Sequence, residues 1–200
     1  MTFRELSVPG AWEITPKVYE DSRGGLFEWF TGEAFSEMTG RSFTLRQANC
    51  SVSAARVLRG LHFAQLPPSQ AKYVTCVKGA VFDVVVDIRV GSPTFGQWDS
   101  VLLDDVDHRT AYLSEGLAHG FCALQDDSTV MYLCSTPYTP EREHTISPHD
   151  PAIGIRWPFP ADDLVVSDRD AAAPSLDEVR AAGLLPTWDG YTAFTAALPK

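Results

Sequence analysis

The chain has few cysteines and no long apolar run. Its 200 residues include four cysteines, which are widely spaced and form no Cys-x-x-Cys pair. We therefore expect no disulfides, and thiols that are buried as small hydrophobic side chains. No apolar segment is long enough to cross a bilayer, and the first residues lack the hydrophobic core of a signal peptide. The sequence predicts a cytoplasmic protein.

Basic residues are also scarce. The chain has 16 lysines and arginines against 26 aspartates and glutamates, which gives a net charge of −10. Broad binding to nucleic acids or to anionic membranes requires a basic face, so the composition argues against both. An anionic substrate would have to be bound locally by a few arginines. The hydrophobic content of 44% is enough for a core, and the length suits one domain over residues 1–200.

Strand-like segments dominate the middle of the chain. Residues 73–77 and 80–90 are rich in β-branched and aromatic side chains, and Lys78-Gly79 predicts a tight turn between them. Short strands separated by turn residues indicate an all-β antiparallel sandwich or barrel. Helices are expected only towards the ends, at 31–38 and at 176–182, where Ser175 and Glu178 form a capping box. Further strands are expected at 98–103, 110–113, 120–124 and 129–134.

The most informative stretch is Arg59-Gly-Leu-His62-Phe, which Lys72 follows ten residues after the histidine. A guanidinium can hold a phosphate, an imidazole can take a proton near neutral pH, and an ammonium can stabilise a developing oxyanion. An enzyme that acts on a phosphorylated carbonyl compound needs all three groups. The alternative is an arginine and a lysine on a solvated strand edge, with a packed histidine between them.

A second histidine, His119, follows Gly116 by three residues. This spacing resembles the second motif of the metal-binding cupins, in which a His-x-His pair and a glutamate complete the ligand set. Here His62 has no second histidine two residues on, so a third ligand and the usual carboxylate are missing. We therefore expect no metal site. The other histidines lie in polar or proline-rich segments and are expected on surface loops: His108, His144 and His149.

Several segments in order along the chain together resemble the dTDP-4-dehydrorhamnose 3,5-epimerase family. The resemblance runs from about residue 8 to residue 185. It implies a cupin-type double-stranded β-helix, or jelly roll, with short terminal helices, and a homodimer that exchanges N-terminal strands. It also implies a dTDP-4-keto-6-deoxyhexose substrate and neither a metal nor a redox cofactor. The segments are 59–63, 71–72, 78–89, 91–98, 115–121, 150–155 and 167–174.

The chemistry of such an epimerase explains its catalytic residues. A ketone at C4 acidifies the hydrogens at C3 and C5, because the resulting carbanion delocalises onto O4. Inversion needs a base on one face, a stabilised enolate oxygen and an acid on the other face. The resemblance implies that His62 is the base, hydrogen-bonded to Asp170, that Lys72 lies near O4, and that Tyr132 is the acid. Without the family resemblance, Tyr132 would be interpreted as a core aromatic residue and Asp170 as a turn residue.

The resemblance also assigns substrate-binding residues. Two arginines would hold the diphosphate, two residues from the partner subunit would meet the thymine, two polar residues would line the cleft, and one aromatic residue would cover the nucleotide. His119 and Asp83 would support Lys72 in a buried polar network. The diphosphate would be held by Arg23 and Arg59, and the thymine would be met by Phe27 and Glu28. The cleft would be lined by Gln47 and Asn49, and the nucleotide would be covered by Tyr138. The alternative for Arg23 and Glu28 is an exposed charged turn.

Departures from the family pattern leave the outcome of the reaction open. Ala48, Ser114 and Leu133 differ from the usual residues, and the tail after Leu185 is longer than usual. These features resemble the branch that serves specialised deoxysugar pathways, including those of antibiotics, in which some members invert one carbon only. We expect inversion at C3 and leave C5 open. The alternatives are a 3,4-ketoisomerase, a non-catalytic sugar-nucleotide-binding cupin and a metal-dependent cupin.

Overall fold

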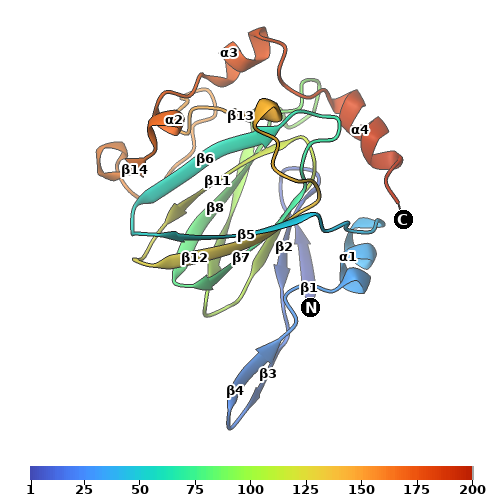
Figure 1. Cartoon of the computed structure of the whole chain (residues 1–200), viewed down its shortest axis with the longest axis vertical. Helices are drawn as coiled ribbons and strands as arrows, with labels where there is room; N and C mark the ends of the chain where they lie inside the picture. Colours follow the sequence, from blue (N-terminus) through green and yellow to red (C-terminus); the bar gives the residue numbers. More distant parts are fainter. Residues whose placement is uncertain (200) are drawn as a thin grey trace.

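Strands dominate the computed structural model, which describes residues 1–199 (Figure 1). The helices are α1 (Gly32–Thr39), α2 (Asp168–Ala171), α3 (Leu176–Ala181) and α4 (Trp188–Ala196), with single 3-10 turns at Pro140–Arg142 and Ala161–Asp163. The strands are β1 (Thr2–Glu5), β2 (Ala11–Thr15), β3 (Val18–Asp21), β4 (Gly24–Phe27), β5 (Gln47–Ser53), β6 (Val57–Ala64), β7 (Lys72–Lys78), β8 (Ala80–Asp87), β9 (Trp98–Asp104), β10 (Thr110–Leu113), β11 (Leu117–Ala123), β12 (Ser128–Cys134), β13 (Glu143–Thr145) and β14 (Val165–Val166).

Two sheets face each other and enclose the main core. The first has the strand order β1-β2-β10-β7-β12-β5, and the second has the order β13-β6-β11-β8-β9, with β14 added beside β6. Alternate residues of each strand point to the same face, so every second side chain points between the sheets. Val74 of β7, Val85 of β8 and Val130 of β12 meet there and are at most 1% exposed. The chain is therefore mostly β, with few helices.

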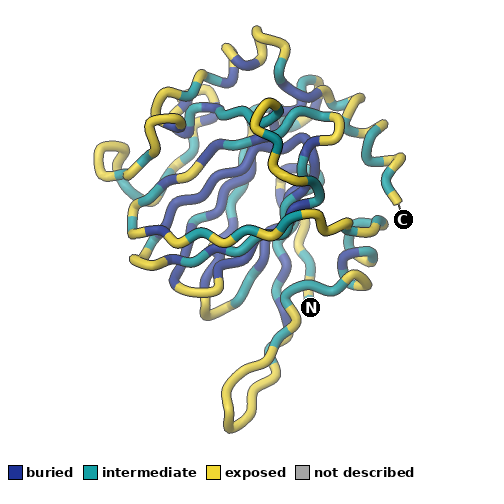
Figure 2. Tube along the Cα trace, in the orientation of Figure 1, coloured by how far each residue is buried: buried dark blue, intermediate teal, exposed yellow. Residues whose placement is uncertain are grey.

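The outer face of each sheet is covered as well. On the second sheet, Leu61 and Phe63 of β6 pack against residues of the C-terminal third, among them Leu176 of α3. On the first sheet, the Tyr112 ring of β10 meets the Phe35 ring of α1 edge-on, with centroids 4.9 Å apart. Both faces of the strands are therefore buried in the centre of the molecule, where the strands are dark blue in Figure 2.

The hairpin of β3 and β4 projects from the body of the molecule (Figure 1). It forms a separate two-stranded sheet, and its residues are largely exposed (Figure 2). The apolar Leu26 of β4, which pairs with Tyr19 of β3, is 74% exposed. An apolar side chain in this position contributes nothing to the core of its own chain.

A buried arginine ties the C-terminal helix to the sheets. Arg89 is fully buried, and its Nη2 lies 2.8 Å from Asp87 Oδ2. The guanidinium carbon lies 4.8 Å from the Trp188 ring and 4.3 Å from the Tyr191 ring, and both rings belong to α4. Arg89 Nη1 has no hydrogen-bond partner among the described residues, so the faces of these rings supply its electrostatic contact.

Most expected elements are present, with differences at their ends. The strand expected at 80–90 ends at Asp87, because the Asp87 carboxylate accepts hydrogen bonds from the Arg89 N–H and from the hydroxyls of Ser92 and Thr94. These bonds fold the chain into a turn. Nearly every residue of β8 is buried, so both of its faces are covered. The capping box at Ser175 is confirmed, with α3 ending at Ala181.

Other expectations need correction. His144 lies on β13, with its ring centroid 5.3 Å from that of Phe63, and is not a surface loop residue. A histidine in a polar segment of sequence can still reach a sheet when a short strand adds to an edge. Helix α4 was not expected, and Cys50 is exposed whereas the other three cysteines are buried. Over residues 1–199 no helix is long and apolar enough to cross a membrane.

Candidate active site

The polar side chains named from the sequence meet inside the sandwich. Lys72 of β7 shares the inward face with Val74, and Tyr132 of β12 packs against the same core. His119 of β11 pairs in register with His62 of β6. His62 alternates with Leu61 and Phe63, which point to the outer face, so His62 points inward. Each strand of this group therefore contributes one polar side chain to the space between the sheets.

His62 and Asp170 form a hydrogen-bonded dyad. His62 Nε2 lies 2.8 Å from Asp170 Oδ1, and the Gly60 N–H donates to Asp170 Oδ2 over 3.2 Å. Asp170 is buried on the short helix α2, which Ser167 caps. Burial alone would raise the pKa of Asp170, but the hydrogen bond and the charge of His62 outweigh it and hold the pKa below its usual value. Asp170 is therefore ionised and fixes the orientation of the imidazole.

The backbone beside His62 requires glycine. Gly60 has φ 119°, and a Cβ at this position would lie 2.6 Å from the Gly120 Cα and 2.7 Å from the His119 carbonyl oxygen. The pairing of β6 and β11 is irregular at this point, between His119 and Phe121. The close approach of the two strands turns the Gly60 N–H towards Asp170. The glycine of the sequence motif is thus explained by its geometry.

Lys72 is half-buried, and groups that favour its charge lie near it. Burial lowers its pKa, while the nearby Cys134, Glu143 and Asp83 raise it, with burial the larger effect. Cys134 is the register partner of Lys72 on β12. An ammonium in such a site is poorly solvated, so an oxyanion placed beside it would be stabilised strongly.

Tyr132 faces the same interior from the first sheet. Burial raises the pKa of its phenol, and the charge of Arg59 and a hydrogen bond with Asn49 lower it by less. Asn49 is its register partner on β5. The phenol therefore keeps its proton at neutral pH and can donate it.

His119 and Asp83 form a second buried pair. His119 Nε2 lies 2.7 Å from Asp83 Oδ2, and His119 is 8% exposed. Asp83 also acts on the charge of Lys72. The His119–Asp83 bond of the expected polar network is present, and its support of Lys72 stays a prediction.

The expected nucleotide-binding residues of the cleft also lie near one another. Gln47 Nε2 donates to Asn49 Oδ1 over 2.9 Å, and the Tyr138 N–H donates to Gln47 Oε1 over 2.8 Å. Arg59 Nε donates to Ser53 Oγ over 3.1 Å. The Tyr138 side chain is 52% exposed, as a residue that closes over a ligand would be.

Three predicted binding residues lie elsewhere. Arg23, Phe27 and Glu28 belong to the projecting hairpin or follow it directly (Figure 1). The Arg23 guanidinium pairs with Asp21, and its side chain is 88% exposed. The Phe27 ring stacks on His108, with centroids 4.1 Å apart. Within one chain these residues are not brought to the dyad.

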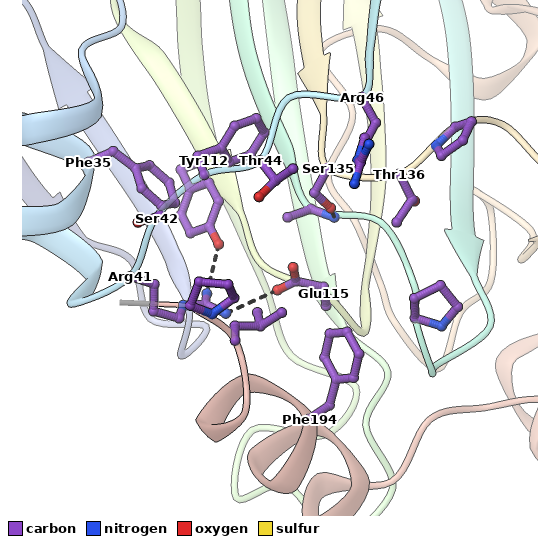
Figure 3. Close-up of a pocket in the computed structure, with 16 residues that line it drawn as sticks. Phe35, Arg41, Ser42, Thr44, Arg46, Tyr112, Glu115, Ser135, Thr136 and Phe194 are labelled. Carbon is purple, nitrogen blue, oxygen red and sulfur yellow. Dashed lines mark hydrogen bonds and ion pairs between the residues drawn. The ribbon is translucent and has the colours of Figure 1, made fainter.

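A pocket of about 380 Å³ opens at the dyad and is lined by Arg59, His62, Arg169 and Asp170 among others. A different pocket, of about 290 Å³, lies at the outer face of the first sheet (Figure 3). There the Arg41 guanidinium meets Glu115 at 3.3 Å and donates to the Tyr112 hydroxyl. None of the predicted site residues lines this second pocket, whereas Arg59, His62 and Asp170 line the first one. Lys72 and Tyr132 line neither pocket.

Three residues of the site were missed by the sequence analysis. Glu143 pairs with Ala64 on β6 and so shares the inward face of His62, and burial raises its pKa against the charges of Lys72 and His62. Arg169 lines the dyad pocket, and Cys134 faces Lys72. Glu143 lies in a polar stretch without strand character, so only the edge pairing of β13 reveals it. No sequence signal marks Cys134.

A metal-dependent cupin would need a set of side chains placed to bind an ion. Over residues 1–199, no group of three or more histidine, cysteine, aspartate or glutamate side chains is arranged to hold an ion. His62 and His119 are each bound to a different aspartate instead.

Comparison with known proteins identifies the family. The model of the dTDP-4-dehydrorhamnose 3,5-epimerase family matches residues 5–178. The chain is 68% identical to the dTDP-4-dehydrorhamnose 3,5-epimerase of Mycolicibacterium smegmatis, over 100% of this chain and 98% of that protein. Among solved structures it is similar to an epimerase of Mycobacterium tuberculosis, with TM-score 0.96, 65% identity and coverage of 99% and 100%. It is also similar to a 3′-monoepimerase of Streptomyces bikiniensis in complex with dTDP-quinovose, with TM-score 0.91, 46% identity and coverage of 96% of both chains. The chain belongs to the dTDP-4-dehydrorhamnose 3,5-epimerase family and is an isomerase of dTDP-linked deoxysugars.

Proposed function

We propose that the chain inverts C3 and C5 of a dTDP-4-keto-6-deoxyhexose. The observation that carries the proposal is the His62–Asp170 dyad, which faces the same interior as Lys72 and Tyr132. Inversion at both carbons is supported by the name of the mycobacterial relative, a 3,5-epimerase that is 68% identical. A sandwich of this strand order also supports the cupin jelly roll expected from the sequence.

The proposed reaction begins with removal of the C3 proton by His62. The electron pair of the C–H bond moves into the C3–C4 double bond, and that of the ketone moves onto O4. Lys72 stabilises the resulting enolate oxygen. When the enolate collapses, C3 takes a proton from the Tyr132 hydroxyl on the opposite face, which leaves a phenolate and an imidazolium. Proton exchange with water restores both groups, and the same sequence at C5 follows after the sugar reorients.

The charges around the site fit this sequence. Asp170 is ionised and stabilises the imidazolium that forms on His62. Glu143 lies close enough to act on both Lys72 and His62, so it balances their positive charges. Arg169 and Arg59 line the dyad pocket and supply cations for the diphosphate.

We propose that two chains form a homodimer in which each hairpin completes the site of the partner. The hairpin exposes Leu26 and carries Arg23 and Phe27 away from the dyad of its own chain. A second copy would cover its apolar side chains and would use its arginine and aromatic ring at the nucleotide. The four unpaired cysteines are consistent with the reducing cytoplasm as the place of action.

Incubation with dTDP-4-keto-6-deoxyglucose in heavy water tests the reaction, with the His62→Ala variant as the control for non-enzymatic exchange. We expect deuterium and inversion at both C3 and C5, measured by mass spectrometry and NMR. Label and inversion at C3 alone would make the chain a 3-monoepimerase, the activity named for the Streptomyces bikiniensis structure. A carbonyl moved to C3 would indicate a ketoisomerase, and an unlabelled, unchanged substrate would refute the proposed function.

Mixing two defective variants tests the exchange of hairpins. In a heterodimer of Arg23→Ala and His62→Ala, one site carries both defects and the other carries neither, if the hairpin serves the partner. We expect activity well above that of either variant alone after the two are unfolded and refolded together. If the hairpin served its own chain, the mixture would show no gain.

A further inference from the structure

The loop between β6 and β7 joins the strand of the base to the strand of the cation. It runs over residues 65–71, and Ser69 within it is 3% exposed. Ser69 has φ 56°, in the left-handed region that residues other than glycine rarely adopt. A buried serine in this conformation is held by its surroundings, and its contacts show what holds it.

Ser69 is bonded to the start of its own loop and to two other segments. Its N–H donates to the Gln65 carbonyl over 2.8 Å, and its carbonyl accepts from the Thr136 hydroxyl over 2.8 Å. Its own hydroxyl accepts from the Gly116 N–H over 3.0 Å. Every polar atom of Ser69 is therefore engaged, and two of the three bonds reach distant parts of the chain.

Each of these partners lies beside a strand of the proposed site. Gln65 follows β6, which carries His62, and Ser69 itself precedes β7 with Lys72. Gly116 precedes β11, which carries His119, and Thr136 follows β12, which carries Tyr132. His62, His119 and Tyr132 are each within four residues of a contact of Ser69, and Lys72 is three residues from Ser69 itself. Ser69 is thus the point at which the connections of the four strands meet.

We infer that Ser69 is a positioning residue that sets the relative placement of His62, Lys72 and Tyr132. The inference rests on the proposed function. Proton transfer needs donor and acceptor held to within a fraction of an ångström, and a small displacement of one strand end is transmitted to the side chain next to it. The Ser69 hydroxyl is the critical part, because Gly116 is buried and its N–H would otherwise be left without an acceptor.

The chain offers a matched control for the loss of such a hydroxyl. Ser128 is fully buried, and its hydroxyl donates to the Ala80 carbonyl over 3.0 Å. It begins β12, whereas Thr136 follows the other end of that strand. Ser128→Ala therefore removes a buried hydroxyl of the same kind from the end of the sandwich that lies away from Lys72 and Cys134.

The experiment compares Ser69→Ala, Thr136→Val and Ser128→Ala with the unmodified chain. We measure the melting temperature, the affinity for dTDP, kcat and KM, and the ratio of deuterium exchange to inversion at C3. Ser69→Ala should lower kcat roughly tenfold, with dTDP affinity nearly unchanged and a raised ratio of exchange to inversion. Thr136→Val should act in the same direction, and Ser128→Ala should lower the melting temperature without changing kcat.

Equal kcat in Ser69→Ala and Ser128→Ala would overturn the inference, as would a loss of dTDP affinity equal to the loss of kcat. If Ser69→Ala does not fold, Ser69→Gly suits the left-handed backbone, also lacks the hydroxyl, and should show the same fall in kcat. If the unmodified chain shows no inversion, the proposed function itself is refuted. Normal turnover in the variants is a different result, which would refute only the role of Ser69.

Discussion

His62 Nε2 lies 2.8 Å from Asp170 Oδ1, and the second oxygen of the same carboxylate accepts the Gly60 N–H. With both oxygens engaged, the carboxylate has a fixed orientation. When Nε2 of the neutral imidazole donates to Asp170, Nδ1 carries no proton and is the atom that can accept one. The dyad therefore selects the tautomer that a general base requires.

Removal of the base should abolish the reaction. We expect His62→Ala to lower kcat by about 10²–10⁴ and to stop solvent exchange at C3, because no other base is placed to replace it. Asp170→Asn should lower kcat by less, since the imidazole remains but its tautomer is no longer fixed. Steady-state rates and exchange by mass spectrometry check both variants, and dTDP binding serves as the control. Near-normal turnover in His62→Ala would end the proposed mechanism.

The acid should be separable from the base. Without the Tyr132 hydroxyl the enolate still forms, but it is reprotonated mainly on the face that lost the proton. Tyr132→Phe should therefore keep part of the deuterium exchange while losing inverted product. Tyr73→Phe, whose ring packs in the cluster on the outer face of the first sheet, is the matched control and should keep both. Loss of exchange and inversion together in Tyr132→Phe would show that this phenol is not the acid.

Activity should be independent of metal ions. His62 and His119 are each hydrogen-bonded to an aspartate, and the His-x-His and glutamate ligand set does not surround them. Dialysis against a strong chelator should leave kcat unchanged, as checked by metal analysis and by assay of the same sample. Activity that is lost on chelation and restored by one divalent ion would place the chain among the metal-dependent cupins.

Two buried thiols should make the fold sensitive to alkali. Burial raises the pKa of Cys76 to about 11, and it raises that of Cys122 to about 11. Because the thiol in the unfolded chain titrates near pH 8.5, the folded chain holds these protons more tightly. The stabilisation is complete below that pH and is lost as the pH rises towards 11. The loss is about 3 kcal/mol for each thiol.

Urea unfolding between pH 8 and pH 11 measures this effect. Cys76→Ala and Cys122→Ala should each flatten the fall of the unfolding free energy with pH, whatever they do to stability at pH 7. Cys50→Ala changes an exposed thiol and should leave the slope as it is. Equal slopes in all three variants would show that the buried thiols do not titrate as expected.

Local patterns predicted much of the fold. The strands expected at 110–113 and 129–134 are β10 and most of β12, and the capping box at Ser175 marks a helix start that the structure shares. What local patterns do not contain is pairing between distant segments. His144 was misplaced because β13 is a strand only through its pairing with β6. Helix α4 was missed because the contact with Arg89 that holds it lies about a hundred residues away in sequence.

The site residues also fall into two groups: those that sequence patterns predict, and those that only the pairing of distant segments reveals. His62 and Lys72 carry their chemistry in their residue types, and the family pattern added Asp170 and Tyr132, which alone would have been interpreted as a turn residue and a core aromatic residue. The structure brings His62 and Asp170 to hydrogen-bond distance although 108 positions separate them. Glu143 has no distinguishing neighbour in sequence. It becomes part of the site only through the edge of the second sheet.

The contact of Arg89 with the rings of Trp188 and Tyr191 limits how far the C-terminus can be shortened. A recombinant chain cut after residue 186 would retain every residue proposed for catalysis. It would nevertheless expose the Arg89 guanidinium, which is fully buried in the full chain. Because Arg89 also bonds the Pro9 carbonyl, solvent would enter between the two ends of the polypeptide. Shortened versions intended for crystallisation or screening should therefore keep residues 187–199, and an affinity tag belongs beyond them.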